Sequence, residues 1–69
     1  MAHMSIARRV RAFRKLKGLT QCELSKRVDI SIAVIGSIER GTRKPDERIL
    51  GRIADELGVT IDELIGVNK

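Results

Sequence analysis

Aromatic side chains are almost missing from this 69-residue chain: Phe13 is the single aromatic residue, and Trp and Tyr are absent. A hydrophobic core must therefore be built from Ile, Leu, Val and Ala. A domain of this length buries only about 60% of the surface that its unfolded chain exposes. The sequence thus predicts one small domain with a thin core, which a partner subunit or a ligand can reinforce.

Residues that carry catalytic or metal chemistry are equally scarce. A single cysteine, Cys22, excludes an internal disulfide and a paired-cysteine metal site. The single histidine, His3, has no nucleophile near it, and the sequence contains no phosphate-binding glycine loop. We therefore expect no enzyme, no metal, no cofactor and no small-molecule ligand.

Long apolar runs and a signal peptide are also absent, which argues against a membrane span and against secretion. We expect a cytoplasmic protein of a bacterium, or of a phage in its host. Residues 1–4, Met-Ala-His-Met, are typical of a cloning remnant, with Met4 as the natural start. The expected domain covers residues 5–67.

Basic residues are in excess, and they are unevenly distributed. The chain has 14 Lys and Arg against nine Asp and Glu, a formal net charge of +5. Residues 1–45 contain eleven of the bases and three of the acids, whereas the remainder contains three bases and six acids. The first two thirds of the chain therefore form the candidate surface for a polyanion such as nucleic acid.

Apolar residues recur with a helical period throughout, and no segment alternates as a strand does. Thr20 with Glu23 and Thr60 with Glu63 have the spacing of capping boxes, and Ser31 and Asp46 are good N-cap residues. Glycines 18, 41, 58 and 66 are placed to end helices. These signals predict helices over about residues 6–17, 21–28, 32–40, 47–57 and 61–65. The residues expected on inward faces are Ile6, Val10, Phe13, Leu16, Leu24, Val28, Ile35, Ile38, Ile49, Leu50, Ile53, Ala54 and Leu57.

Only Asp29, Ile30 and Ser31 separate the second expected helix from the third. So short a connection makes two helices cross steeply, as in the helix-turn-helix unit. We expect Ile30 to point inward at this corner.

Several runs of sequence resemble the phage-repressor and Cro type (XRE-type) helix-turn-helix family. Residues 19–24, Leu-Thr-Gln-Cys-Glu-Leu, are similar to the family's LTQxEL opening, and residues 35–41, Ile-Gly-Ser-Ile-Glu-Arg-Gly, to its IxxIERG run. Pro45, residues 53–59 and residues 62–64 are similar to its closing part. The resemblance covers residues 6–67 and implies an all-α, compact five-helix bundle of the lambda-repressor-like DNA-binding fold, with the helix-turn-helix in its second and third helices.

The resemblance also implies roles for individual residues in binding double-stranded DNA. The third helix would enter the major groove as the recognition helix. Arg14 and Glu39 match the family's ion pair between the first and third helices. The residues expected to face base edges are Ser31, Ile32, Ala33, Gly36 and Ser37. The residues expected at phosphates are Gln21, Arg14, Arg40, Arg43 and Lys44.

Three features depart from the family pattern. Ser25 stands where Ala is usual, and its hydroxyl can bond back to the preceding turn. Asp29 stands where Gly is usual, so we expect a strained but intact turn. Ile32, Ala33 and Gly36 occupy positions where polar side chains are common, so we expect readout by thymine methyl contacts, DNA shape and phosphate contacts.

One copy of such a domain contacts only a few base pairs, so specific binding needs two copies on a palindrome. The apolar residues available for a homodimer contact are Val59, Ile61, Ile65 and Val67. The expected function is regulation of transcription, as a phage repressor, a host regulator, a restriction–modification controller or an antitoxin, either whole or as part of a longer protein. The alternative is a protein-interaction module that keeps the fold without specific DNA readout.

Overall fold

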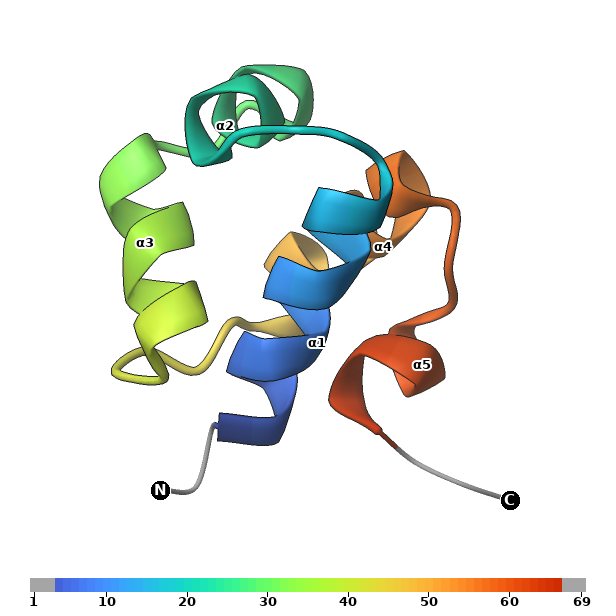
Figure 1. The fold of residues 1–69 in the computed structure, drawn as a ribbon. Coiled ribbons are helices and arrows are strands. Elements are labelled where there is room, and N and C mark those ends of the chain that lie inside the picture. The colour runs from blue at the N-terminus through green and yellow to red at the C-terminus, as the bar shows by residue number, and fades with distance from the viewer. Residues whose placement is uncertain (1–3, 67–69) are drawn as a thin grey trace.

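The computed structural model describes residues 4–66, and in this range the chain folds into five helices (Figure 1). These are α1 (Met4–Leu16), α2 (Gln21–Val28), α3 (Ile32–Arg40), α4 (Glu47–Leu57) and α5 (Ile61–Ile65), and residues 4–66 contain no strand. The prediction of an all-α five-helix fold is confirmed. The bounds of α2 to α5 agree with the expected ones residue for residue.

Side-chain caps explain why the bounds of α2 to α5 could be predicted. The hydroxyls of Thr20 and Thr60 accept hydrogen bonds from the amides of Glu23 and Glu63, whose carboxylates accept from the threonine amides in return. Ser31 and Asp46 cap α3 and α4 in the simpler, one-sided way. Each cap satisfies an amide that has no partner inside the helix, so each helix begins at a defined residue.

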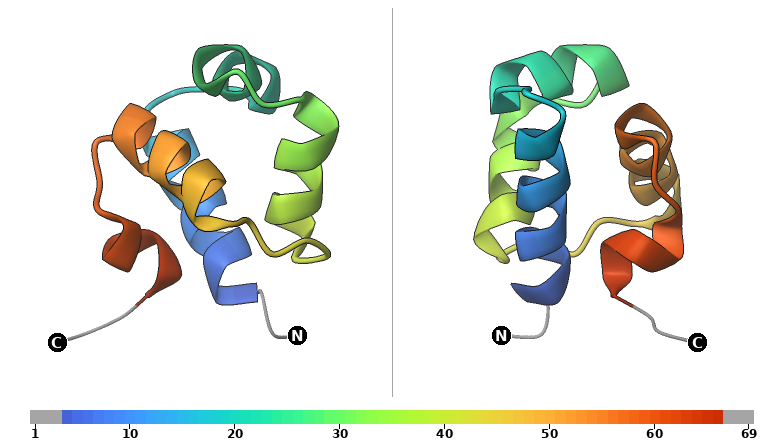
Figure 2. Two further views of the ribbon diagram at one scale, coloured as in Figure 1. Left: turned by 180° about the vertical axis from the view of Figure 1, so that it is seen from behind. Right: turned by 45° about the vertical axis from the view of Figure 1, so that its right-hand side comes forward.

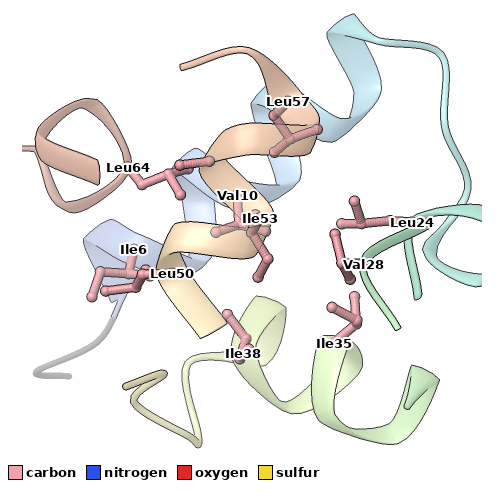
Figure 3. Close-up of a cluster of buried hydrophobic side chains, with 11 residues drawn as sticks. Ile6, Val10, Leu24, Val28, Ile35, Ile38, Leu50, Ile53, Leu57 and Leu64 are labelled. Carbon is pink, nitrogen blue, oxygen red and sulfur yellow. The ribbon is translucent and has the colours of Figure 1, made fainter. Parts of the chain in front are cut away.

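The core lies where α1, α2, α3 and α4 meet, and α5 closes one side of it (Figure 3). Figure 3 shows Ile38 of α3 pointing toward Ile53 of α4, next to Val10 of α1, and Ile35 of α3 pointing toward Val28 of α2. The largest fully buried side chains are Leu24, Ile35, Ile38, Ile53, Leu64, Val10 and Pro45. Phe13 and Ile30 are half-buried and pack against this cluster, so the aliphatic core expected from the composition is confirmed.

The first helix, α1, is the centre of the arrangement, with α3 on one side of it and α5 on the other (Figures 1 and 2). The charges are divided unevenly among the helices. The basic segment supplies α1, α2 and α3, whereas the acidic segment supplies α4 and α5. Most of the excess positive charge is on α1, which contains five Lys and Arg and no acidic residue, and exposed Arg43 and Lys44 follow α3.

Two expectations for α1 were wrong. The helix begins at Met4 rather than at residue 6 and ends at Leu16 rather than at residue 17. Leu16 was expected inside but is 81% exposed, because it lies roughly 120° around the helix from Val10. The side chains buried on α1 are instead Ile6, Ala7, Val10 and Arg14.

Candidate nucleic-acid interface

Helices α2 and α3 run across one another at the corner formed by residues 29–31 (Figures 1 and 2). Asp29 ends α2 with φ 58° and ψ 44°, in the left-handed region. The turn is therefore strained but intact, as the sequence predicts. The hydroxyl of Ser25 donates to the carbonyl of Cys22 at 2.8 Å, so this departure from the family pattern is absorbed inside α2. The turn therefore sets α3 across α2, with one side of α3 on the core and the other outward.

The expected ion pair between Arg14 and Glu39 is present and nearly buried. Arg14 Nε donates to Glu39 Oε2 at 2.7 Å and Nη2 to Oε1 at 3.0 Å, and the two side chains are 9% and 3% exposed. Arg14 Nη1 also donates to the carbonyl of Leu19 at 2.7 Å. The hydrogen bonds to Glu39 and its negative charge raise the pKa of Arg14 above its ordinary value, although burial opposes them. The pair fixes α3 against α1.

Gln21 completes this network from the start of α2. Its Nε2 donates to Glu39 Oε1 at 3.0 Å, so Gln21, which was expected at a phosphate, also supports α3. Arg14 was expected to serve at a phosphate as well. Arg14 is buried, and its donors are already bonded to Glu39 and Leu19, so we do not expect it to contact a phosphate.

The outward side of α3 is small and largely apolar. Ser31, Ile32 and Ala33 are exposed, and Ile32 is one of the few large apolar side chains that solvent reaches, at 48%. Ser37 is half-buried, and its hydroxyl donates to the carbonyl of Ala33 at 2.9 Å. Its oxygen therefore faces outward mainly as a hydrogen-bond acceptor.

Gly36 was expected on this side too, but it is buried. The side chain of Arg40 covers it, so that a Cβ at Gly36 would meet Arg40 Nη1 at 3.0 Å. Sequence reasoning missed this arrangement, although a glycine four residues before an arginine on an outward helix face is a signal that could have indicated it.

The segment after α3 presents its cations to solvent. Arg40, Arg43 and Lys44 are all exposed, on the same side of the molecule as the end of α3. Thr42 anchors the segment, since its amide and its hydroxyl both donate to the carbonyl of Ser37, at 3.1 and 3.2 Å. Buried Pro45 fixes its other end. The segment is therefore held in place beside α3 rather than left loose.

The residues expected at a dimer contact lie at the other flank. Ile61 is 37% exposed, whereas Val59 and Ile65 are half-buried against the core. Val67, expected at the same contact, and residues 1–3 of the expected cloning remnant lie outside the described residues. Met4 forms the first residue of α1.

Other kinds of site find no support between residues 4 and 66. Cys22 is exposed, and no three His, Cys, Asp or Glu side chains of this range gather where they could hold a metal ion. None of the helices described has both the length and the apolar character that crossing a membrane requires.

Comparison with known proteins agrees with this geometry. The sequence model of the Helix-turn-helix family HTH_3 matches residues 10–64. The chain is 51% identical over 62 residues to the HTH-type transcriptional regulator YazB of Bacillus subtilis strain 168, covering 90% of each chain. It is 30% identical over 63 residues to the immunity repressor protein of Bacillus phage phi105, covering 91% of this chain and 44% of that protein.

A solved structure is similar over nearly its whole length. The restriction–modification controller protein C.AhdI from Aeromonas hydrophila superposes with a TM-score of 0.84 at 28% identity, covering 88% of this chain and 92% of the other. The shared backbone includes the helix pair that carries the candidate interface.

Proposed function

From the premise that this chain belongs to the helix-turn-helix family HTH_3, we propose that it binds a palindromic site in double-stranded DNA as a homodimer, with α3 in the major groove. The chain is a DNA-binding regulator of transcription, and its relatives are regulators rather than enzymes. Its place of action is the cytoplasm, where bacterial and phage DNA is transcribed. The observation that carries the proposal is the outward side of α3, held rigidly by Arg14, Glu39 and Gln21.

Base contacts in this proposal come from the first turns of α3. Ile32 and Ala33 are exposed there and suit the methyl groups of thymine, and the hydroxyl of Ser31 remains a donor beyond its capping bond. Ser37 adds an acceptor on the next turn. Because these side chains are short, the backbone of α3 can lie close to the base edges.

Phosphate contacts come from both sides of α3. Arg43 and Lys44 are exposed on the anchored segment after the helix, and Gln21 is half-buried at the start of α2. The free amides at the starts of α2 and α3 add partial positive charge on the same side. Each cation that neutralises a phosphate releases counterions, so binding must weaken steeply as salt rises.

Dimensions favour two copies. The molecule measures 31 × 24 × 20 Å, whereas half-sites on one face of DNA are about 34 Å apart. One copy therefore spans one half-site, and two copies side by side meet at their ends. The flank that carries Ile61 lies opposite α3 across α1 and remains open for such a contact.

A titration of random-sequence duplex DNA at several salt concentrations tests the DNA surface. For the Lys44→Gln variant, we expect the slope of log affinity against log salt to become shallower by about 0.9. Lys17→Gln is the matched control, because it removes the same charge next to Gly58, at the end of α4. Equal slopes for both variants, or no binding of random duplex at low salt, would contradict the proposed surface. The latter result would favour a protein-interaction module.

A further inference from the structure

The side chain of Arg40 runs back along the outer surface of α3 instead of extending away from it. Its Nη1 and Cζ lie 3.0 and 3.9 Å from the position that a Cβ on Gly36 would take, and its Nη2 donates to Ser37 Oγ at 3.4 Å. This direction is the ordinary one for a helix, because side chains tilt toward the N-terminus and cover the residue four positions earlier. The guanidinium therefore lies over the middle of α3 and not over its end.

Gly36 is the residue that makes room for this guanidinium. Glycine inside a helix is less favourable than alanine by roughly 1 kcal/mol, so its presence in the centre of α3 needs a reason. A Cβ at Gly36 would lie 3.0 Å from Arg40 Nη1 and 3.8 Å from Gln21 Oε1, so it would crowd the guanidinium. Gly36, with Gln21 beside it, thus leaves a slot in which the arginine side chain fits.

Within the described part of the chain, no carboxylate forms a salt bridge with Arg40. Glu39, the acidic residue of α3, is bound by Arg14 and Gln21 and is nearly buried. Among residues 4–66 the salt bridges are Arg14–Glu39 and Arg27–Glu56, and neither involves Arg40. Apart from the long bond to Ser37, the donors of the exposed Arg40 therefore remain available to an acceptor outside the protein.

We propose that Arg40 reads a guanine in the major groove, with Gly36 as the slot that positions it. The inference rests on the proposed function and replaces the phosphate contact expected for Arg40 from the resemblance. The planar fork of arginine matches O6 and N7 of guanine, which is the commonest specific contact between proteins and bases. Arg40 supplies the polar base contact that Ile32, Ala33 and Gly36 cannot make.

Selection of bound sequences from a random duplex pool tests the inference with three proteins: the wild type, Arg40→Lys and Gly36→Ala. Lysine keeps the charge of Arg40 but lacks the two-pronged donor pattern. We expect the wild-type pool to contain an invariant G·C pair in each half-site, and the Arg40→Lys pool to lose it. Replacing that pair should weaken wild-type binding by about tenfold to a hundredfold and Arg40→Lys binding much less, with equal affinity of both proteins for random duplex.

Gly36→Ala separates the slot from a merely structural role. The added methyl group shifts a flexible guanidinium by a few tenths of an ångström and meets no backbone, so the variant should fold with a higher melting temperature and yet select the invariant pair less strongly than the wild type. Arg11→Lys is the matched control, because Arg11 is exposed on α1 and has no part in the proposed interface, and it should select the wild-type sequence. Identical selected sequences for Arg40→Lys and the wild type would overturn the guanine contact, and an unchanged selection by Gly36→Ala would overturn the slot. A wild-type pool without any enrichment would instead refute the proposed function.

Discussion

At the scale of single residues, the Arg14 guanidinium is the most consequential group in the molecule. It is bonded to Glu39 of α3 and to the carbonyl of Leu19 in the loop before α2, so one side chain links α1 to both parts of the helix-turn-helix. Among the described residues, no buried side-chain nitrogen or oxygen lacks a hydrogen-bond partner, so the polar atoms of this network are all satisfied. A buried charge pair of this kind is stabilising only while both partners are present.

Removing one partner should therefore cost more stability than removing both. We expect Arg14→Met to lower the free energy of unfolding by about 3 kcal/mol, because Glu39 is left buried with Gln21 as its remaining partner. The double variant Arg14→Met/Glu39→Leu should recover most of that loss. Urea denaturation in sulfate buffer, which keeps weak variants folded, measures both. A double variant as unstable as the sum of the two single variants would contradict this account of the pair.

Glu23 makes stability depend on pH. Its carboxylate accepts a hydrogen bond from the amide of Thr20 at 2.8 Å, and this bond is the main reason that the pKa of Glu23 is lowered. The Thr20 hydroxyl and the charges of Arg27 and Lys26 act in the same direction. A depressed pKa in the folded state means that the stabilisation is complete above the unfolded-state pKa of Glu23 and is lost as pH falls through the folded-state value.

The variant Glu23→Gln isolates this effect, because glutamine can still close the capping box but cannot titrate. We expect the wild type to melt at a higher temperature than the variant at neutral pH, and the difference to shrink toward zero in acid. Melting curves of both proteins from neutral to strongly acidic pH measure it. A difference that stays constant over the whole range would show that the charge of Glu23 is not involved.

At the scale of elements, the turn between α2 and α3 carries avoidable strain at Asp29. The residue has φ 58°, a conformation that disfavours a Cβ, and its negative charge lies at the C-terminus of α2, where the helix dipole opposes it. Neither feature is needed for the direction of α3, because the backbone of a glycine can take the same angles.

Asp29→Gly should therefore raise the free energy of unfolding by about 1 kcal/mol, even though glycine gains entropy in the unfolded chain. Asp29→Asn is the matched control: it keeps the Cβ and removes the charge, so its smaller gain measures the dipole contribution alone. Chemical denaturation of the three proteins gives both values. Loss of stability in Asp29→Gly would mean that the carboxylate makes a contribution that outweighs the backbone strain.

Element boundaries could be predicted wherever a side chain defines them. Thr20, Ser31, Asp46 and Thr60 fix the starts of four helices, because each satisfies a free amide in its own helix. No comparable cap was recognised before the first helix, and its start was misplaced by two residues. The capping residues were thus sufficient to predict where four helices begin, whereas the start of the first helix could not be predicted in this way.

What could not be predicted depended on contacts between or along helices. Apolar periodicity placed Leu16 on the inner face of α1, where Arg14 lies instead, although the resemblance had indicated the pair of Arg14 with Glu39. The position of Arg40 over Gly36 depends on a side-chain rotamer, which a residue pattern does not specify. The candidate base-facing residues were predicted from the resemblance, whereas the position of the Arg40 side chain over Gly36 is seen only in the structure.

At the scale of the whole molecule, the separation of charge and apolar surface assigns different tasks to the two flanks. Exposed Arg43 and Lys44 follow α3 and suit DNA, whereas α5 at the other flank is acidic and presents Ile61. Acidic residues near the proposed dimer contact would repel the phosphates and so keep that flank from competing for DNA. DNA binding and the proposed dimer contact can therefore be tested separately by substitutions with uncharged residues.

Ile61→Gln should weaken binding to a palindrome about tenfold and leave binding to a single half-site unchanged, because it removes apolar area from the proposed dimer contact without altering charge. Leu16→Gln is the matched control, since Leu16 is 81% exposed, more than any other large apolar side chain whose exposure the structure describes, and lies outside the proposed contact. Titrations of both variants with palindromic and half-site duplexes measure the ratio of the affinity for the palindrome to the affinity for the half-site. If Leu16→Gln lowers the ratio and Ile61→Gln does not, the two copies meet through α1, and the flank that carries α5 has another purpose.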